Sequence, residues 1–282
     1  VLSTKYGKIE DLILALEVVL PTGELVRTLP VPRHATGPEF TQLFVGSEGT
    51  LGIITEVTAK LYRVPEERRF RSLLFESLHD GLEAGRRIMT GGWKPCVLRL
   101  YDAPSTQRFL RRVLGLAVPE GKACLMVGFD GDAERVAFEE GQCLELCAAL
   151  GAEDLGPESG EHWWAHRYDF YFPPLTPMLP ECFGTMDTVT TYDKIEGLYE
   201  AMRRVVEEGY QQWDARFTGH FSHWYEWGTM VYARFFIERP PQDPHEAVRL
   251  YNAIWNDGVR TAMAHGGVLN EHHGIGLKLG WL

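Results

Sequence analysis

The amino-acid sequence predicts an α+β fold, in which helices pack on one face of a sheet. Between residues 70 and 150, strand-like apolar runs alternate with amphipathic stretches of helical length. The region before them shows a hairpin pattern and a glycine-rich turn instead. With 282 residues, of which 45% are hydrophobic, the chain can bury one large core or two medium ones.

The first element expected is a β-hairpin within residues 12–29. Two apolar runs rich in β-branched residues flank a turn at 21–24, which contains Pro21 and Gly23. Proline presets the backbone for a turn and glycine tolerates its left-handed positions, so this pattern predicts two paired strands.

The glycine-rich segment 46–52 is expected to form a tight turn that leads into a strand. Three glycines in seven residues let the backbone come close to a ligand, and Ile53, Ile54 and Val57 predict a buried strand that ends near Val64. A flat cofactor would fit against such a backbone, and a plain hairpin turn is the alternative. The segment is neither a P-loop nor a Rossmann loop, because no Lys-Ser/Thr pair follows it and a strand, not a helix, comes next.

Beyond a domain boundary at residues 65–66, the alternating pattern predicts a ferredoxin-like arrangement. The expected strands are 70–76, 96–101 and 123–129, and the expected helices are 79–90, 104–114 and 132–150. An irregular segment rich in aromatic residues and proline is expected over 152–190. After it come a helix at 193–209, strands at 212–221 and 228–238, and a helix at 244–265 that ends at Gly266 and Gly267.

Charge and composition limit the partners of the chain. A net charge of −11 argues against nucleic acid or an anionic membrane surface, since both attract clustered lysine and arginine. No apolar run approaches the length of a membrane span. Five cysteines without a CxxC pair favour a reducing compartment, so we expect a cytoplasmic protein with buried thiols. The expected partner is a small-molecule substrate, and a homodimer stays open.

Two histidine-containing segments carry groups that move protons. His220 and His223 lie close to Tyr225, and His272 and His273 follow Glu271. The alternative is that these histidines cap helices or satisfy hydrogen bonds in the core. We expect no metal site, because consecutive histidines on a regular element point in different directions.

Two arginines are further candidates for the site. Arg99 lies in an apolar strand, where a buried guanidinium needs an anion or a polar network. A structural ion pair with Asp102 is the alternative. Arg167, between His166 and Tyr168, could likewise bind an anion or form a structural ion pair.

Taken together, these segments resemble the flavin-dependent oxidases and dehydrogenases of the vanillyl-alcohol-oxidase (PCMH-type) superfamily. The similarity is greatest to the alkylglycerone-phosphate synthase (alkyldihydroxyacetonephosphate synthase) branch and its bacterial relatives. The matching segments, in family order, are 6–12, 46–56, 99–100, 222–225 and 272–276. The resemblance covers the chain from about residue 1 to its last residue.

The resemblance implies FAD as the cofactor and a division into two domains. Residues 1–65 would be the C-terminal part of the PCMH-type FAD-binding domain, and residues 66–282 the FAD-linked oxidase C-terminal (cap) domain. The family's pyrophosphate loop lies upstream of the 6–12 segment. We therefore expect the chain to be a C-terminal fragment that is inactive alone, as Val1 at its start also indicates.

The resemblance also implies roles for single residues. Tyr225 matches a catalytic acid/base, Arg99 an arginine that offsets developing negative charge, and His272 and His273 two residues of a triple histidine. Because free phenol has a pKa of about 10, Tyr225 would need cationic neighbours that lower it. Substrate contacts are expected from His223 and Arg167. The implied flavin contacts are Glu48, Gly49, Thr50, Leu51, Gly52, Ile53 and Ile54.

The sequence departs from the branch at two positions. Glu271 replaces the third histidine and brings the segment closer to the D-2-hydroxyacid dehydrogenases, whose Gly-His-x-Gly-Asp-Gly-Asn-x-His metal motif is absent here. The arginine that reads the substrate phosphate in the synthase aligns near Pro173. We expect an FAD-dependent oxidoreductase or alkyl-transferring synthase that uses flavin N5 chemistry on a small oxygenated substrate. A D-2-hydroxyacid dehydrogenase of lactate or glycolate type and a non-catalytic scaffold are the alternatives.

Overall fold

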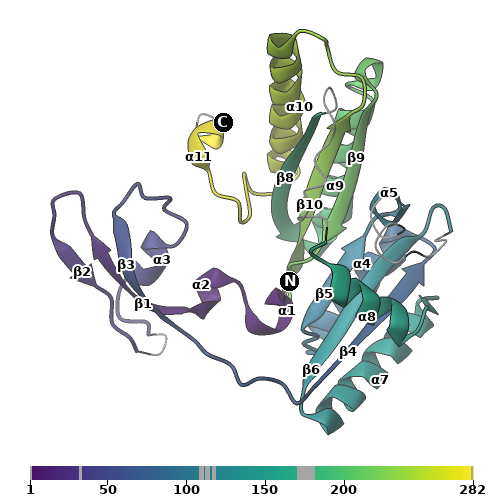
Figure 1. Ribbon diagram of the computed structural model, residues 1–282, viewed down its shortest axis with the longest axis horizontal. Coiled ribbons are helices and arrows are strands. Elements are labelled where there is room, and N and C mark those ends of the chain that lie inside the picture. The colour runs from purple at the N-terminus through teal and green to yellow at the C-terminus, as the bar shows by residue number, and fades with distance from the viewer. Residues whose placement is uncertain are drawn as a thin grey trace.

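The protein forms two sheets joined by one extended connection (Figure 1). The computed structural model describes residues 2–31, 34–107, 111, 115, 119–169, 182–280 and 282. A three-stranded sheet lies to one side of a seven-stranded sheet, and the short N-terminal helices α1 and α2 lie between them. The elements before residue 65 are α1 (Ser3–Tyr6), α2 (Ile9–Leu12), β1 (Ile13–Val19), β2 (Leu25–Arg27), α3 (Phe40–Phe44) and β3 (Ile53–Ala59).

The expected hairpin is confirmed. Strand β1 pairs antiparallel with β2, with Glu17 opposite Arg27, and Gly23 takes the left-handed backbone angle that the turn needs, at φ +84°. Strand β1 also pairs antiparallel with β3, which gives the order β2-β1-β3.

The expectation that the strand after the glycine turn is buried is wrong. Every residue of β3 is exposed, with 69% of Ile53, 41% of Ile54 and 49% of Val57 accessible, and the strand ends at Ala59. The small core of this sheet lies instead beneath α3, around Leu16, Val18 and Phe44. An apolar, β-branched run favours a strand, but whether the strand is buried depends on a second element that packs against it. Among the described residues, no element covers β3.

The remaining elements build the seven-stranded sheet and its helices. They are β4 (Glu67–Phe75), α4 (Leu78–Thr90), β5 (Val97–Tyr101), α5 (Ala103–Ser105), β6 (Ala123–Gly131), α7 (Ala133–Ala149), β7 (Glu153–Asp154), α8 (Pro157–His166), β8 (Cys182–Thr191), α9 (Tyr192–Glu207), the 3-10 helix η2 (Gln211–Trp213), β9 (Ala215–Phe221), β10 (Gly228–Ile237), α10 (Pro244–Ala264) and α11 (Gly276–Leu279). Most of the helix expected over 104–114 lies outside the described residues.

The large sheet has the order β7-β4-β6-β5-β9-β10-β8, and every neighbouring pair is antiparallel. The first half has the chain order β4-α4-β5-β6-α7-β7, and its strands lie in the sheet in the order β7-β4-β6-β5. This is the expected ferredoxin-like arrangement. The second half, β8-α9-β9-β10-α10, repeats this pattern without a fourth strand. The halves join where β5 pairs with β9, with Tyr101 opposite His220.

One face of the large sheet packs against four helices. Side chains that alternate along the strands share one core with Ile88 of α4, Cys143 of α7, Leu198 of α9 and Ile254 of α10. The strand residues of this core that are largest and fully buried are Leu73, Phe75, Leu98, Leu100, Leu125, Phe129, Phe217, Phe221 and Phe235.

The opposite face is covered in its first half by α8. This corrects the expectation of an irregular segment over 152–190, which contains β7, α8 and β8; residues 170–181 lie outside the described residues. Helix α8 approaches β4 closely because Gly160 has no side chain: a Cβ there would stand 2.6 Å from the Arg71 backbone nitrogen. Trp163 is buried and donates its indole N–H to the Tyr101 hydroxyl at 3.1 Å.

No disulfide joins any of the five cysteines, all of which lie among the described residues. Cys143 and Cys147 are buried. Burial raises the pKa of Cys147 to about 12, so it stays an unreactive thiol at neutral pH. Among the described residues, no helix combines the length and the apolar character needed to cross a bilayer.

A glycine in α4 gives a test of how this helix packs. The change Gly85→Ala places a Cβ in overlap with the Trp224 ring, so we expect it to destabilise the protein by about 1–3 kcal/mol. The matched change Gly141→Ala in α7 meets nothing within 4 Å and is expected to stabilise by about 0.5–1 kcal/mol. Urea midpoints measure both, and a midpoint for Gly85→Ala at or above that of the parent would contradict this packing.

Candidate active site

A row of polar side chains crosses the open face of the large sheet. The antiparallel register aligns Asp187 of β8, Tyr232 of β10, His220 of β9 and Tyr101 of β5. Side chains opposite one another in a sheet project to the same face, so all four lie on the face opposite α4, α7, α9 and α10, and α8 covers Tyr101. This row forms the floor of the candidate site.

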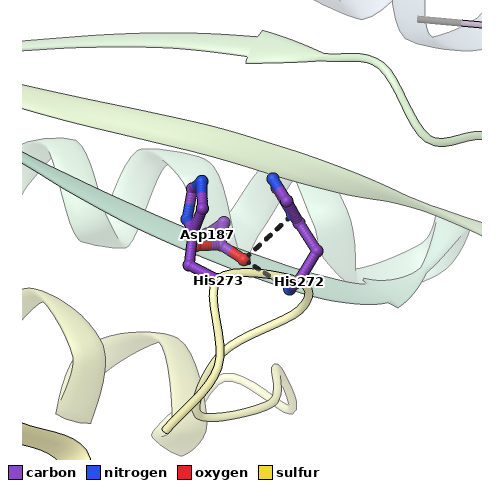
Figure 2. Close-up of side chains that lie close together, drawn as sticks. All are labelled: Asp187, His272 and His273. Carbon is purple, nitrogen blue, oxygen red and sulfur yellow. Dashed lines mark hydrogen bonds and ion pairs between the residues drawn. The ribbon is translucent and has the colours of Figure 1, made fainter. Parts of the chain in front are cut away.

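Asp187 anchors the loop that follows α10 onto this floor. Its carboxylate accepts the backbone N–H groups of Glu271 at 2.8 Å and His272 at 2.9 Å. It also accepts hydrogen bonds from Nδ1 of His273 at 2.5 Å and Nδ1 of His272 at 3.2 Å, so the two imidazoles flank it (Figure 2). Asp187 is only 3% exposed, and four hydrogen bonds are what allow an ionised carboxylate to be buried.

Gly266 and Gly267 let the loop reach the sheet. Gly266 has φ +84°, and a Cβ on Gly267 would overlap the Thr188 hydroxyl. Thr188 donates that hydroxyl to the Val268 carbonyl at 2.8 Å. The glycine pair therefore ends α10, as expected, and also permits the close approach of the loop.

The premise that consecutive histidines point apart is wrong for His272 and His273. Both reach Asp187, because they lie on a loop and not on a regular strand or helix. Burial opposes the charged form of His272, but the hydrogen bonds that it donates to Asp187 and Glu271 outweigh this effect and raise its pKa to about 9. Burial would likewise raise the pKa of Asp187, but the two histidines hold it well below its usual range.

Glu271 is the centre of a second, connected cluster. Its side chain is 2% exposed. Its carboxylate contacts Lys8 Nζ at 2.5 Å, His272 Nδ1 at 2.6 Å and His223 Nδ1 at 3.0 Å. It also accepts the Tyr225 hydroxyl at 3.0 Å. Burial would raise its pKa, but the hydrogen bonds from His223, His272 and Lys8 hold it well below the usual range, so Glu271 is an anion.

Tyr225 is therefore a phenol whose proton points at a carboxylate. Burial first, and then the charge of Glu271, raise the pKa of Tyr225 above its ordinary value, while Lys8 opposes the shift. This corrects the expectation that cationic neighbours lower the pKa of Tyr225. The backbone around it is fixed, because Tyr225 N–H bonds the Gly228 carbonyl at 2.9 Å and its own carbonyl accepts the Tyr192 hydroxyl at 2.5 Å.

Lys8 comes to this cluster from the other end of the chain. The N-terminal segment is fixed to β6 by Lys5 and Tyr6, which bond the buried carboxylate of Asp130 at 2.8 and 2.9 Å. Burial opposes the charge of Lys8, but Glu10 and Glu271 raise its pKa above the ordinary range, so it stays a cation. A cavity of about 210 Å³ opens between this segment and the loop that carries Tyr225. Its walls include Lys5, Lys8, Lys94, His223, Tyr225 and Trp227.

The glycine turn contacts the histidine loop. Glu48 Oε2 accepts the backbone N–H of Gly276 at 2.7 Å, and a Cβ on Gly274 would overlap Glu48 Oε1. Gly46 and Gly49 have φ +77° and +79°, and a Cβ on either would meet nothing within 4 Å. The turn lines a cavity of about 340 Å³ formed by Phe44, Gly46, Ser47, Glu48, Gly49, Gly52, Ile53 and Ile54.

The two candidate arginines lie in different places. Arg99 donates Nη2 to Nε2 of His220 at 2.7 Å and so joins the sheet floor. Asp102, the alternative partner, is bonded instead to the Tyr199 hydroxyl at 2.7 Å and the Gly219 N–H at 2.5 Å. Arg167 lies at the C-terminal end of α8, 3.5 Å from the Trp164 ring centre, and its described contacts do not include the Glu271 cluster.

The site could also offer ligands to a metal ion. Two triads bring their ligand atoms within 4.8 Å of one another, Asp187 with His272 and His273, and His223 with Glu271 and His272. The two carboxylates already face two cations, Lys8 and the protonated His272. The described cluster is thus balanced in charge by its own side chains.

Sequence reasoning missed three residues of this cluster. Asp187 was identifiable as a lone acid in a strand of small and apolar residues, where a charge must have a partner. Lys8 lies within the 6–12 segment, but no sequence pattern around it indicates a functional role. Glu271 was noted as the carboxylate beside the histidine pair and as a departure from a triple histidine, but not as the centre of the hydrogen-bond network that the structure shows.

The raised pKa of His272 predicts a pH-dependent stability. The folded pKa of about 9 exceeds the ordinary 6.5, so the stabilisation is complete below pH 6.5 and is lost as pH rises through 9. Because the side chain is 29% exposed, solvent screening keeps this contribution on the order of 1 kcal/mol. The change His272→Gln removes the titration, so its urea midpoint should fall less than that of the parent between pH 6 and 10. Parallel pH profiles for the two proteins would contradict the assignment.

Comparison with known proteins agrees with this architecture. Residues 64–279 match the family of FAD linked oxidases, C-terminal domain. The chain is 26% identical to alkyldihydroxyacetonephosphate synthase of Trypanosoma brucei brucei, over 98% of this chain and 48% of that protein. It is 30% identical to the uncharacterized FAD-linked oxidoreductase YgcU of Escherichia coli (strain K12), over 97% of this chain and 58% of that protein. The chain thus spans about half the length of the curated relatives it matches.

A solved structure of alkyldihydroxyacetonephosphate synthase superposes with a TM-score of 0.77 at 24% sequence identity, over 96% of this chain and 52% of that one. At this identity the likeness establishes the fold, which is the expected α+β architecture. The family match covers most of the chain. The chain belongs to the FAD linked oxidase family, through that family's C-terminal domain.

Proposed function

We propose that the chain forms the substrate-facing part of an FAD-dependent oxidoreductase, in which Tyr225 moves the proton of a small hydroxyl-bearing substrate. The observation that carries this proposal is the hydrogen bond from Tyr225 to Glu271, inside a cluster that also holds Lys8, His223 and His272. Separate segments of the chain converge on one ionised carboxylate, which is typical of a site built for proton transfer.

The two-domain division is part of this proposal. Strand β3 ends at Ala59 and β4 begins at Glu67, and the two sheets share no strand. The family match begins at residue 64. Residues 1–65 would belong to the FAD-binding domain, and residues 66–282 would form the cap over the substrate.

The glycine turn is suited to hold part of a flavin. Its cavity is lined by three glycines, by the apolar Phe44, Ile53 and Ile54, and by Ser47 and Glu48, and a Cβ on Gly46 or Gly49 would stand in open space. The exposed Ile53 and Ile54 would gain cover from a flat, apolar ring. Glu48 through Ile54 would form one wall of the cofactor site. FAD, when bound there, supplies a hydride acceptor at its N5 atom.

The residues of the chain would orient and deprotonate the substrate. Tyr225 gives its only proton to Glu271 and its oxygen also faces Lys8, so a substrate hydroxyl would donate to the remaining lone pair of that oxygen. As the substrate carbon loses a hydride, the hydroxyl proton would pass to Tyr225 while the proton of Tyr225 moves toward Glu271. The cationic His272 lies beside this path and would hold the substrate oxygen with His223 and His273. This orientation favours oxidation of a hydroxyl over a redox-neutral exchange of acyl for alkoxy groups.

Replacing the phenol tests the proton transfer. In the flavin-loaded holoenzyme, Tyr225→Phe should lower kcat by about 10²- to 10⁴-fold, because general acid–base catalysis is lost while packing is kept. The matched control is Tyr210→Phe, whose hydroxyl bonds Asp257 at 2.6 Å outside the cluster. Stopped-flow reduction of the flavin measures the step, and unchanged turnover in Tyr225→Phe would exclude this role.

A second pair of variants tests the cofactor wall. Gly49→Leu and Gly23→Leu both place a side chain at positive φ, where each should cost about 1–2 kcal/mol of stability. A Cβ on either glycine would meet nothing within 4 Å, so the two changes differ little in steric cost. We expect the flavin-to-protein ratio, from the visible spectrum, to fall by more than about half only in Gly49→Leu, because its side chain would fill the cofactor space. Equal flavin content in the two variants would show that the turn does not face the cofactor.

A further inference from the structure

Lys8 and Tyr225 share one oxygen of Glu271. Lys8 Nζ contacts Oε1 of Glu271 at 2.5 Å, and the Tyr225 hydroxyl donates to the same atom at 3.0 Å. The other oxygen, Oε2, accepts Nδ1 of His272 at 2.6 Å and is the nearer atom to Nδ1 of His223, at 3.0 Å against 3.3 Å for Oε1. The carboxylate thus has an ammonium and a phenol on one side and two imidazoles on the other.

The three groups around Oε1 come from distant parts of the chain. Tyr225 lies between β9 and β10, Glu271 lies between α10 and α11, and Lys8 lies between α1 and α2. The Lys8 side chain is 14% exposed and also contacts Glu10 Oε1 at 2.7 Å. Glu10 is 34% exposed and Glu271 is 2% exposed, so the charge of Lys8 acts more strongly on Glu271, where less water screens it.

The position of Lys8 is set by a buried anchor two to three residues before it. The Asp130 side chain is 0% exposed and receives Lys5 Nζ at 2.8 Å and the Tyr6 hydroxyl at 2.9 Å. Arg68 Nε lies 3.4 Å from the same carboxylate. Separating these partners would leave a buried charge unpaired, which is costly. The N-terminal segment therefore holds Lys8 in one place.

We propose that Lys8 is a positioning residue for proton transfer, whose ammonium holds Oε1 of Glu271 against the Tyr225 hydroxyl. The inference rests on the proposed function and states how its acid–base pair is assembled. Without Lys8, the buried carboxylates of Asp187 and Glu271 would share the charge of His272, and Glu271 would lose a donor on the side that faces Tyr225. The acceptor of the Tyr225 proton would then be misplaced.

This role makes proton transfer depend on docking between the two proposed parts of the chain. Lys8 precedes residue 65, within the part that would belong to the FAD-binding domain. Tyr225 and Glu271 lie in the part that would form the cap. The acid–base pair would be complete only when the N-terminal segment is docked on the large sheet.

Turnover of the flavin-loaded holoenzyme tests the role of Lys8. The probes are glycolate, D-lactate and glycerol 3-phosphate, and the variants are compared on the probe that the parent oxidises fastest. Lys8→Met should lower kcat about tenfold to a hundredfold and change KM less than about threefold, because the acceptor is displaced while substrate contacts are kept. Lys8→Arg should recover part of kcat, since it restores a cation at this position.

The matched control is Lys60→Met. Lys60 Nζ donates to the backbone carbonyl of Asp11, so it also contacts the N-terminal segment but lies outside the Glu271 cluster. Its kcat should equal that of the parent. A parental kcat in Lys8→Met, or the same loss in Lys60→Met, would overturn the proposal.

A double-mutant cycle shows whether Lys8 acts through Glu271. Once Glu271→Gln has removed the charge, adding Lys8→Met should lower kcat by less than about threefold further. Losses that multiply in full would place the action of Lys8 elsewhere and contradict the assignment.

A spectroscopic measurement needs neither turnover nor flavin. Lys8 faces the Tyr225 oxygen as well as Glu271, so Lys8→Met changes the surroundings of the phenol. The ultraviolet difference spectrum between Lys8→Met and the parent should contain a tyrosine band, and this band should vanish when both proteins also carry Tyr225→Phe. Absence of the band, at parental thermal stability, would show that Lys8 does not position this pair.

The two proposals can fail separately. Full turnover in Tyr225→Phe, or oxidation of none of the three probes, would count against the proposed function, whereas the Tyr225 band would still support the placement of the pair by Lys8. Loss of turnover in Tyr225→Phe, with a parental kcat and no tyrosine band in Lys8→Met, would refute only the role of Lys8.

Discussion

The burial of Asp187 is the constraint on which the site depends. A carboxylate that is 3% exposed must be fully hydrogen-bonded, and here the loop after α10 supplies the donors. The two backbone N–H groups fix the path of the loop, and the imidazoles of His272 and His273 fix its side chains. Glu271 is thereby turned toward Lys8 and Tyr225. A buried carboxylate in β8 thus fixes the loop that carries Glu271, His272 and His273.

The charges of the open sheet face are divided into two regions. Around Asp187 and Glu271, two anions are balanced by Lys8 and the protonated His272, so this region can take up or release a proton without a large change in field. Around His220, burial and the charges of Arg99 and Arg234 hold the pKa of the imidazole well below its ordinary value, so His220 stays neutral.

Local patterns predicted the elements of the fold but not the contacts between them. Helix α4 begins after Ser77, whose side chain accepts the Asp80 N–H, and its apolar stripe is visible in the sequence. Hence the ferredoxin-like half was predictable. The exposure of β3 was not, since it depends on what covers the strand. The partners of Glu271 were also hidden, because Lys8 lies 263 residues away and only the assembled fold brings them together.

The contact between Glu48 and the loop after α10 joins the glycine turn to the segment that carries His272 and His273. Glu48 has a positive φ of 53°, a conformation that costs about 1 kcal/mol for a residue with a side chain. That strain is offset by the bond from Gly276 N–H to its carboxylate, and the absence of a side chain on Gly274 makes room for it. A ligand that orders the glycine turn must therefore also order the loop carrying His272 and His273. Since Asp187 holds the other side of that loop, the turn, the histidines and Tyr225 keep one fixed geometry, which is what proton transfer over hydrogen-bond distances requires.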